Sequence, residues 1–189
     1  MPDGPDAEAA QIAEILRFWF EETESERRFK KDPVLDEAIR ARFGALHARA
    51  EAGGCAEWAE TAEGALALLV LLDQFSRNLF RDSPRAFACD AAARAIAERA
   101  IERGFDMAVP VDRRVFFYLP FEHNEDMADQ ERCCRLVRER LADAKSIDYA
   151  ERHREVIARF GRFPHRNKAL GRACTPAEDE YLSQPGAGF

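Results

Sequence analysis

Apolar residues recur at spacings of three and four along almost the whole chain, and no stretch of four or more residues alternates convincingly with period two. Ile12, Ile15, Leu16 and Trp19, for example, fall on one stripe of a helix predicted over about residues 7–21. The pattern predicts an all-α protein with about seven to eight helices. Short connections between such helices favour antiparallel helical hairpins, in a tetratricopeptide-like array or an irregular bundle.

Capping residues set the predicted helix ends. Asp32 and Ser83 each precede a proline and predict helix starts. Asp112 predicts the cap of a short aromatic helix that Pro120 would terminate. The segment from Thr175 to Glu178 has the form of a capping box. The predicted helices span about residues 7–21, 33–52, 66–80, 84–104, 113–118, 124–143, 147–160 and 176–182.

Length and composition bound the class of protein. The 189 residues predict a single all-helical domain over residues 1–189, in which residues 183–189 form a flexible or docked tail. No apolar run approaches the roughly 20 residues that cross a bilayer, so we expect no membrane partner. The start of the chain lacks the basic and apolar segments of a secretory signal, which favours a cytoplasmic protein. Five cysteines without CxxC spacing predict reduced thiols rather than a disulfide framework or a zinc site.

The formal net charge of −7 argues against nucleic acid as a partner, because a basic field is what attracts a phosphate backbone. The sequence leaves the cofactor and the oligomeric state open. Three dense polar stretches carry the candidate chemistry.

The first stretch lies at the end of the most apolar segment, residues 66–80, which we expect at the centre of the core. Asp73, Arg77 and Arg81 are spaced four apart, which puts them on one helix face. Buried charges must be paired or face a wet cavity. The stretch therefore predicts either an internal Asp73–Arg77 pair or a ligand-binding face. The ligand-binding candidates are Asp73, Gln74, Arg77, Asn78 and Arg81.

Acidic residues dominate the second stretch, residues 119–131. Glu122, Asp126 and Asp129 fall at i, i+4 and i+7, a spacing that would present one carboxylate-rich helix face to a hard cation or supply a general base. The alternative is that acids in a first helical turn simply complement the helix dipole. Neither HExxH nor ExxH occurs, so no metal site is predicted. The catalytic candidates are Glu122, His123, Glu125 and, from the third stretch, His165.

The third stretch, residues 159–172, carries five cations and no acidic residue in an otherwise acidic chain. Interleaved Phe, Gly and Pro residues predict an ordered loop. An arginine fork suits a carboxylate or a phosphate. The alternative is that these cations offset the carboxylates of the second stretch. The ligand-binding candidates are Arg162, His165, Arg166 and Asn167.

Three strings carry a family resemblance: LLDQFSRNLFR (71–81), LPFEHNEDMADQ (119–130) and RFGRFPHRNKALGR (159–172), the last followed by TPAE. Together with the FWF at 18–20, Trp58 and the GFD from Gly104, they resemble, in order and over nearly the whole chain, the family known as domain of unknown function 924. The resemblance implies a tetratricopeptide-like all-α fold found in bacterial proteins. It implies no known activity, cofactor or catalytic residue.

The sequence contains no nucleophile elbow, phosphate-binding glycine-rich loop or GxGxxG. Our leading hypothesis is a binding module whose first and third stretches form a polar cleft for a small anionic ligand or a peptide carboxylate. An alternative is an enzyme in which His123 or His165, with Glu122 or Glu125, performs general acid–base chemistry on an anionic substrate. A second alternative is a scaffold for protein–protein interaction.

Overall fold

The computed structural model describes residues 4–188, except for the side chain of Pro5. Every regular element within these residues is helical, as the spacing of apolar residues predicts. No helix in this described range is long and apolar enough to cross a membrane. The chain divides into two compact units. Unit 1 comprises residues 1–81 and 85–120, and unit 2 comprises residues 82–84 and 121–189. The expected single domain stays a prediction.

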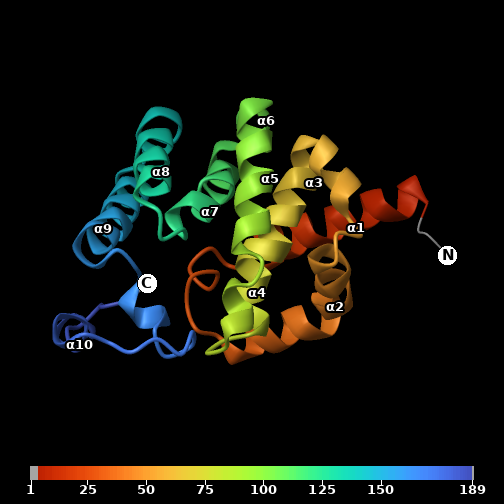
Figure 1. Cartoon of the computed structure of the whole chain (residues 1–189). Coiled ribbons are helices and arrows are strands. Elements are labelled where there is room, and N and C mark those ends of the chain that lie inside the picture. The colour runs from red at the N-terminus through yellow and green to blue at the C-terminus, as the bar shows by residue number, and fades with distance from the viewer. Residues whose placement is uncertain (1–3, 189) are drawn as a thin grey trace. The chain divides into compact units, whose positions relative to one another are not determined.

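The most apolar segment lies at the centre of unit 1, as expected (Figure 1). It forms α3 (Ala62–Leu69), a π-helical turn (Val70–Phe75) and α4 (Ser76–Leu79), and every residue from 64 to 76 is buried. A helix this rich in leucine is stable only when neighbours cover its whole circumference. The covering helices are α1 (Pro5–Arg17), α2 (Pro33–Glu51) and α5 (Asp90–Glu102).

Aromatic rings join these helices at the core. The ring centroids of Phe18 and Phe43 are 5.0 Å apart, and Phe75 lies 5.2 Å from Phe43 and 5.4 Å from Trp19. Edge-to-face and tilted contacts of this kind add to the stabilisation from buried apolar area. They fix the π-helical turn at Phe18–Glu22 against α2 and the central segment.

Two predicted helix boundaries in the middle of the chain are wrong. The chain makes a 3-10 turn at Pro84–Phe87, which buries Ala86, and α5 starts only at Asp90. Pro120 does not terminate the aromatic segment, which is the 3-10 helix Val111–Phe117. Instead Pro120 lies in the first turn of α7 (Leu119–Glu122), where its missing amide is not needed. Between them lies α6 (Phe105–Ala108).

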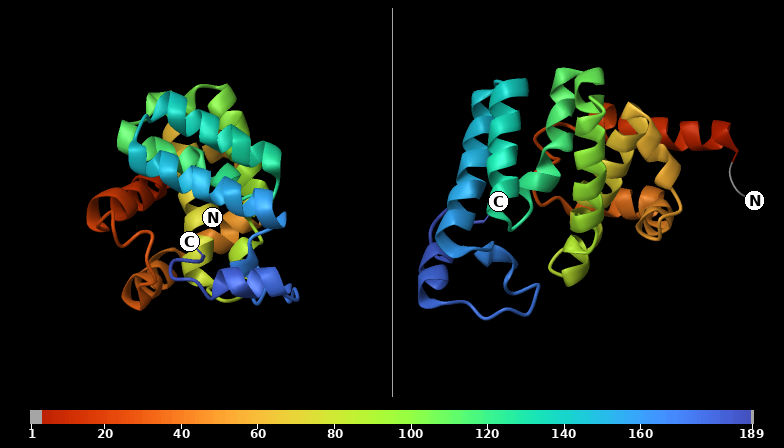
Figure 2. Two further views of the ribbon diagram at one scale, coloured as in Figure 1. Left: turned by 90° about the vertical axis from the view of Figure 1, so that its left-hand side faces the viewer. Right: turned by 45° about the horizontal axis from the view of Figure 1, so that its top comes forward.

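Unit 2 is built on a hairpin of α8 (Met127–Arg140) and α9 (Ala144–Phe160), which lie side by side (Figures 1 and 2). Asp126 caps α8 by accepting from the amides of the first turn, and α9 ends, as predicted, at Gly161 with φ of 67°. A 3-10 turn at Pro164–Arg166 leads to α10 (Pro176–Leu182), which the predicted capping box begins.

The tail lies against unit 2. Residues 184–187 line an open pocket of about 290 Å³ together with Arg159, Phe160 and Tyr181. Gly188 packs on His165, since a Cβ at this glycine would lie 3.2 Å from the Cβ of the histidine. Phe189, which belongs to the predicted tail, lies outside the described residues.

Candidate functional site

The predicted ligand-binding residues fall in both units. Asp73, Gln74, Arg77, Asn78 and Arg81 belong to unit 1, whereas Arg162, His165, Arg166 and Asn167 belong to unit 2. A polar cleft shared by the two sets stays a prediction.

Arg77 is engaged within unit 1. Its guanidinium donates two hydrogen bonds of 2.9 and 3.1 Å to Asp90 on α5, and it lies 3.2 Å from the Asp73 carboxylate. Although burial opposes its charge, Asp73 and Asp90 raise the pKa of Arg77. Gln74 donates to the second oxygen of Asp73 at 2.6 Å. These contacts confirm the predicted internal pair, which braces α4 against α5.

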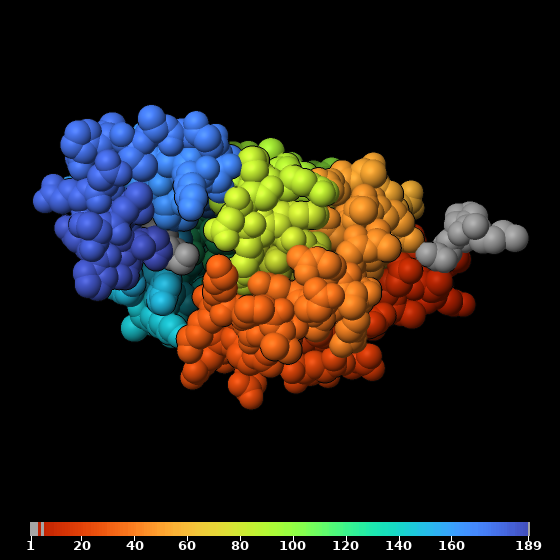
Figure 3. Space-filling view, turned by 90° about the horizontal axis from the view of Figure 1, so that it is seen from below, coloured from red at the N-terminus to blue at the C-terminus, as the bar shows by residue number. Residues whose placement is uncertain are grey.

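Asn78 and Arg81 converge on a buried carboxylate of α2. Asp36 accepts from Asn78 at 2.7 Å and from two nitrogens of Arg81 at 2.5 and 2.8 Å. Figure 3 shows this side of unit 1, where the surface of α2 lies beside that of the segment after α4. The prediction that Arg81 shares a helix face with Arg77 is wrong, because α4 ends at Leu79 and Arg81 follows in a turn.

A buried cluster around Ser76 was not predicted. The Ser76 hydroxyl donates to the carbonyl of Leu72 at 2.7 Å and lies 2.7 Å from Nε2 of His47. Burial lowers the pKa of His47, although Glu51, 3.9 Å from its Nδ1, opposes the shift. With both side chains buried and the hydroxyl proton used by the helix, the cluster bridges α2 and α4 and does not present a nucleophile.

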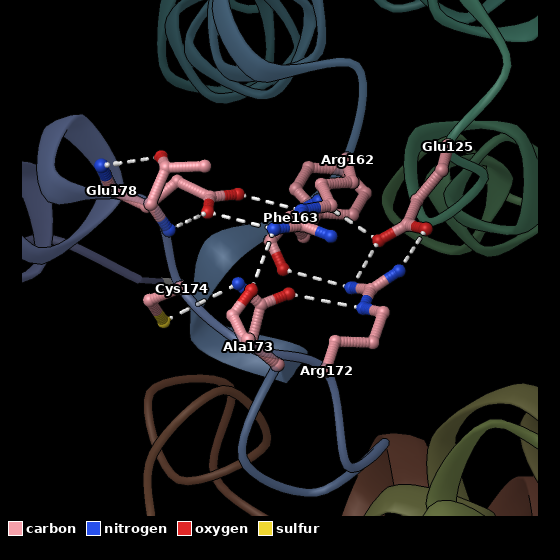
Figure 4. A network of polar contacts seen from close by, with 9 residues as sticks. Glu125, Arg162, Phe163, Arg172, Ala173, Cys174 and Glu178 are labelled. Carbon is pink, nitrogen blue, oxygen red and sulfur yellow. Dashed lines mark hydrogen bonds and ion pairs between the residues drawn. The ribbon is translucent and has the colours of Figure 1, made fainter.

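The third stretch holds carboxylates inside unit 2 (Figure 4). Arg172 binds Glu125 through two hydrogen bonds of 2.7 and 2.9 Å, and the amide of Phe163 donates to the same carboxylate at 2.8 Å. Burial opposes the charge of Glu125, but these donors lower its pKa. Arg162 binds Glu178 of the capping box at 2.6 and 2.7 Å and lowers the pKa of Glu178. Both arginine forks therefore carry internal carboxylates.

Asn167 organises the loop between α9 and α10. It is completely buried, its amide oxygen accepts from Arg172 at 2.9 Å, and its amide nitrogen donates to the sulfur of Cys174 at 3.4 Å. These bonds hold the second half of the loop, which contains Arg172 and Cys174 (Figure 4), against Asn167.

Imidazole and guanidinium groups converge elsewhere in unit 2, around His153 of α9. The ring of His123, from the segment between α7 and α8, lies 6.4 Å from the ring of His153. The ring of Phe163 lies 5.7 Å from His153 and 5.5 Å from His165, and the Arg166 guanidinium lies 4.5 Å from its centroid. His153 and Arg166 are buried, whereas His123 and His165 are half-buried. We call His123, His153, His165 and Arg166 the histidine cluster.

His153 is a neutral imidazole at pH 7. Burial lowers its pKa to about 3; the carbonyl of Tyr149 opposes this shift, and the positive fields of the other cluster members add to it. Nδ1 donates to the Tyr149 carbonyl at 2.8 Å, which leaves Nε2 as the unprotonated nitrogen. The Glu122 carboxyl lies 3.6 Å from Nδ1.

Glu122 is buried between His153 and a thiol. Cys133 of α8 donates to it at 3.9 Å. Burial, reinforced by Glu122, raises the pKa of the Cys133 thiol well above its usual range, so the sulfur stays protonated and unreactive. All five cysteines are free, and four of them are buried.

The predicted carboxylate-rich face does not form in the second stretch. Glu122 ends α7, whereas Asp126 takes the extended backbone of the α8 cap, so the two residues lie on different elements. Gln130 fills the space between these helices and donates to the carbonyls of Glu122 and Asn124 at 2.7 and 2.6 Å. Over residues 4–188 no group of three or more His, Cys, Asp or Glu residues could hold a metal ion.

A family model for bacterial proteins of unknown function (DUF924) matches residues 15–186. The chain belongs to this family. The solved structure of a protein of unknown function, ATU0120 from Agrobacterium tumefaciens, is similar over 93% of this chain and 98% of that one, with 45% sequence identity and a TM-score of 0.88. No curated protein gives a significant match.

All members of the histidine cluster lie within the DUF924 match. The cluster combines two half-buried imidazoles with a buried guanidinium and a buried neutral imidazole next to a carboxyl group. Such a set can donate to an anion, or it can exchange protons with a bound molecule. His153, seven residues before Phe160, points toward the third stretch but was not among the candidate site residues, because only the folded loop packs Phe163, with His165 and Arg166 against it, on the His153 ring.

Proposed function

We propose that this DUF924 chain is a helical binding module that holds a small anionic ligand, or the carboxylate of a peptide, at the histidine cluster of unit 2. The observation that carries the proposal is that His123 lies 6.4 Å from the buried ring of His153, while His165 and Arg166 lie against Phe163, which packs on the same ring. The positive fields of His123, His165 and Arg166 already oppose protonation of His153. An anion among them would offset these positive fields and accept hydrogen bonds.

Four other arginines of the first and third stretches are less suited to a ligand. Arg77, Arg81, Arg162 and Arg172 each hold an internal carboxylate through at least two hydrogen bonds. A ligand would have to displace these partners and leave a buried carboxylate without its cation, which is strongly unfavourable. The negative charge of the nearby Glu125 is offset by hydrogen bonds from Arg172 and from the amide of Phe163, so Glu125 repels an anion only weakly.

The proposal is tested by titrating the protein with inorganic phosphate, citrate and a carboxylate-terminated dipeptide, and by following the imidazole signals in NMR spectra. Binding should shift the signals of His123 and His165.

Matched variants separate the cluster from general electrostatics. His165→Gln should weaken binding at least about tenfold, or about 1.4 kcal/mol. Lys168→Gln removes an exposed cation from the same loop and should change affinity less than about twofold. Equal losses in the two variants, or no binding by any of the three anions, would reject the anion site and favour a protein-interaction scaffold.

A second candidate function is an enzyme that uses general acid–base chemistry. It is favoured by the approach of the buried Glu122 carboxyl to His153, 3.6 Å away, beside two more imidazoles. Glu122→Gln should then abolish turnover of ester or phosphate-ester substrates and leave anion affinity unchanged. Turnover that survives this substitution would contradict the enzyme proposal.

The cytoplasmic location, the bacterial source and the tetratricopeptide-like arrangement of the helices belong to the same proposal. The family match supports the bacterial source, and the hairpin of α8 and α9 supports the tetratricopeptide-like arrangement, whereas the cytoplasmic location rests on the sequence alone.

A further inference from the structure

Unit 1 contains a pocket of about 420 Å³ at the opposite end of its core helix from Arg77. It lies where the start of α1 meets the 3-10 helix Ala56–Glu60 and the start of α3, helices that lie side by side (Figure 1). Its volume is in the range that small-molecule sites occupy. The apolar lining comes from Ala9, Ile12, Trp58 and Ala62.

Three carboxylates surround this apolar lining. Glu8, Glu57 and Glu63 all line the pocket, and within the described part of the chain none of them forms an ion pair. Their neighbour Glu60, which does not line it, is held by Arg103 at 2.8 Å. The three pocket carboxylates therefore keep a negative field without a paired cation among the described residues, and this field favours a cation.

Trp58 supplies an independent observation at the same place. Its side chain is only 2% exposed, and its indole N–H has no acceptor among residues 4–188. Buried donors are nearly always paired in folded proteins. The backbone holds Trp58 tightly, because a Cβ at Gly64 would lie 2.1 Å from the Trp58 carbonyl oxygen. Because Gly64 has no side chain, the first turn of α3 can pack directly against the backbone of Trp58, which lines the pocket.

We propose that this pocket binds a small organic cation with an aromatic or aliphatic body. The carboxylates at the mouth attract the ammonium group, and the apolar lining covers the body. The Trp58 ring, which already has the Arg49 guanidinium 5.7 Å from its centroid, adds apolar surface for the body of the ligand. This pocket lies in unit 1 and takes a cation, whereas the histidine cluster lies in unit 2 and takes an anion. Neither proposal therefore depends on the other.

The test uses the two tryptophan indole N–H signals in a ¹⁵N NMR spectrum, assigned with Trp58→Phe. The probe is 2-phenylethylammonium, and the controls are 2-phenylethanol, which has the same body without charge, and phenylacetate, which reverses the charge. The ammonium should shift the Trp58 signal and leave that of Trp19, which is buried elsewhere in the core, unchanged. It should bind at least about tenfold more tightly than the alcohol.

Carboxylate variants test the charge directly. The double substitution Glu57→Gln and Glu63→Gln should weaken ammonium binding at least about tenfold, whereas Glu102→Gln, at an exposed position of α5 outside the pocket, should change it less than about twofold. The proposal is overturned by a Trp58 signal that does not move up to about 10 mM ammonium. It is also overturned by an alcohol that binds as well as the ammonium, or by an unchanged affinity in the double variant.

Discussion

Acidification from about pH 8 to about pH 5 should destabilise the folded chain through the buried imidazole of His153. The pKa of this side chain falls from 6.5, its ordinary value, to about 3 in the folded protein. Because the folded pKa is the lower of the two, the unfolded chain takes up the proton first. The stability that depends on neutral His153 is complete above about pH 6.5 and is lost as the pH falls toward the folded pKa.

The size of the loss follows from the two pKa values. Proton linkage gives about 2 kcal/mol at about pH 5 and up to about 5 kcal/mol near pH 3, at about 1.4 kcal/mol for each pH unit between the two values. The full effect is expected because only 6% of the His153 side chain is exposed, so solvent does little to screen the charge.

The assay is urea unfolding followed by circular dichroism at a series of pH values, for the wild type and for His153→Gln. The glutamine amide can still donate to the Tyr149 carbonyl but does not titrate. His47, whose pKa burial also lowers, titrates in both proteins, as do the carboxylates. The difference between the two pH profiles therefore isolates His153.

An opposite result has a clear physical meaning. If the Glu122 carboxyl at 3.6 Å governed the titration, the pKa of His153 would be raised, and the wild type would gain stability relative to the variant on acidification. NMR of the folded wild type decides the question even if the variant folds poorly. Its His153 ring signals should stay constant down to about pH 5.

Four substitutions test the stability of the fold inside each unit. Asp36→Asn removes the charge that receives a guanidinium fork and should cost about 2 kcal/mol in urea unfolding. Gly64→Ala should cost at least about 2 kcal/mol, because its Cβ would collide with the carbonyl of Trp58. Gly44→Ala, whose Cβ meets nothing within 4 Å on helix α2, should instead stabilise by up to about 1 kcal/mol. Thr175→Ala removes the capping box and should lower the free energy of unfolding by about 1 kcal/mol, which a lower melting temperature would show.

Helix ends that depend on neighbouring residues were predictable from the sequence. Asp32 accepts from the amides of the first turn of α2, Gly161 ends α9 in the left-handed conformation, and Thr175 and Glu178 form a capping box. Each interaction lies within a few residues, so local pattern is sufficient. After Ser83 the chain begins only the short 3-10 helix Pro84–Phe87, which buries Ala86, and the predicted α-helix starts later, at Asp90.

The three polar stretches were recognisable in the sequence as places of dense chemistry, but their partners were not. Arg81 binds Asp36 from 45 residues away, Arg172 binds Glu125 from 47, and Ser76 meets His47 from 29. Periodicity assigns a side chain to a face of its own helix and says nothing about the helix that packs there.

The sequence by itself determined the all-α class, the capped helix ends at Asp32, Gly161 and Thr175 and the apolar centre of unit 1, because these depend on spacing and on local hydrogen bonds. Only the tertiary structure decided which arginines are occupied by carboxylates and that His123, His165 and Arg166 gather around His153. The physical reason is that pairing and desolvation are properties of packed surfaces, and long-range packing brings together groups whose separation along the chain carries no signal.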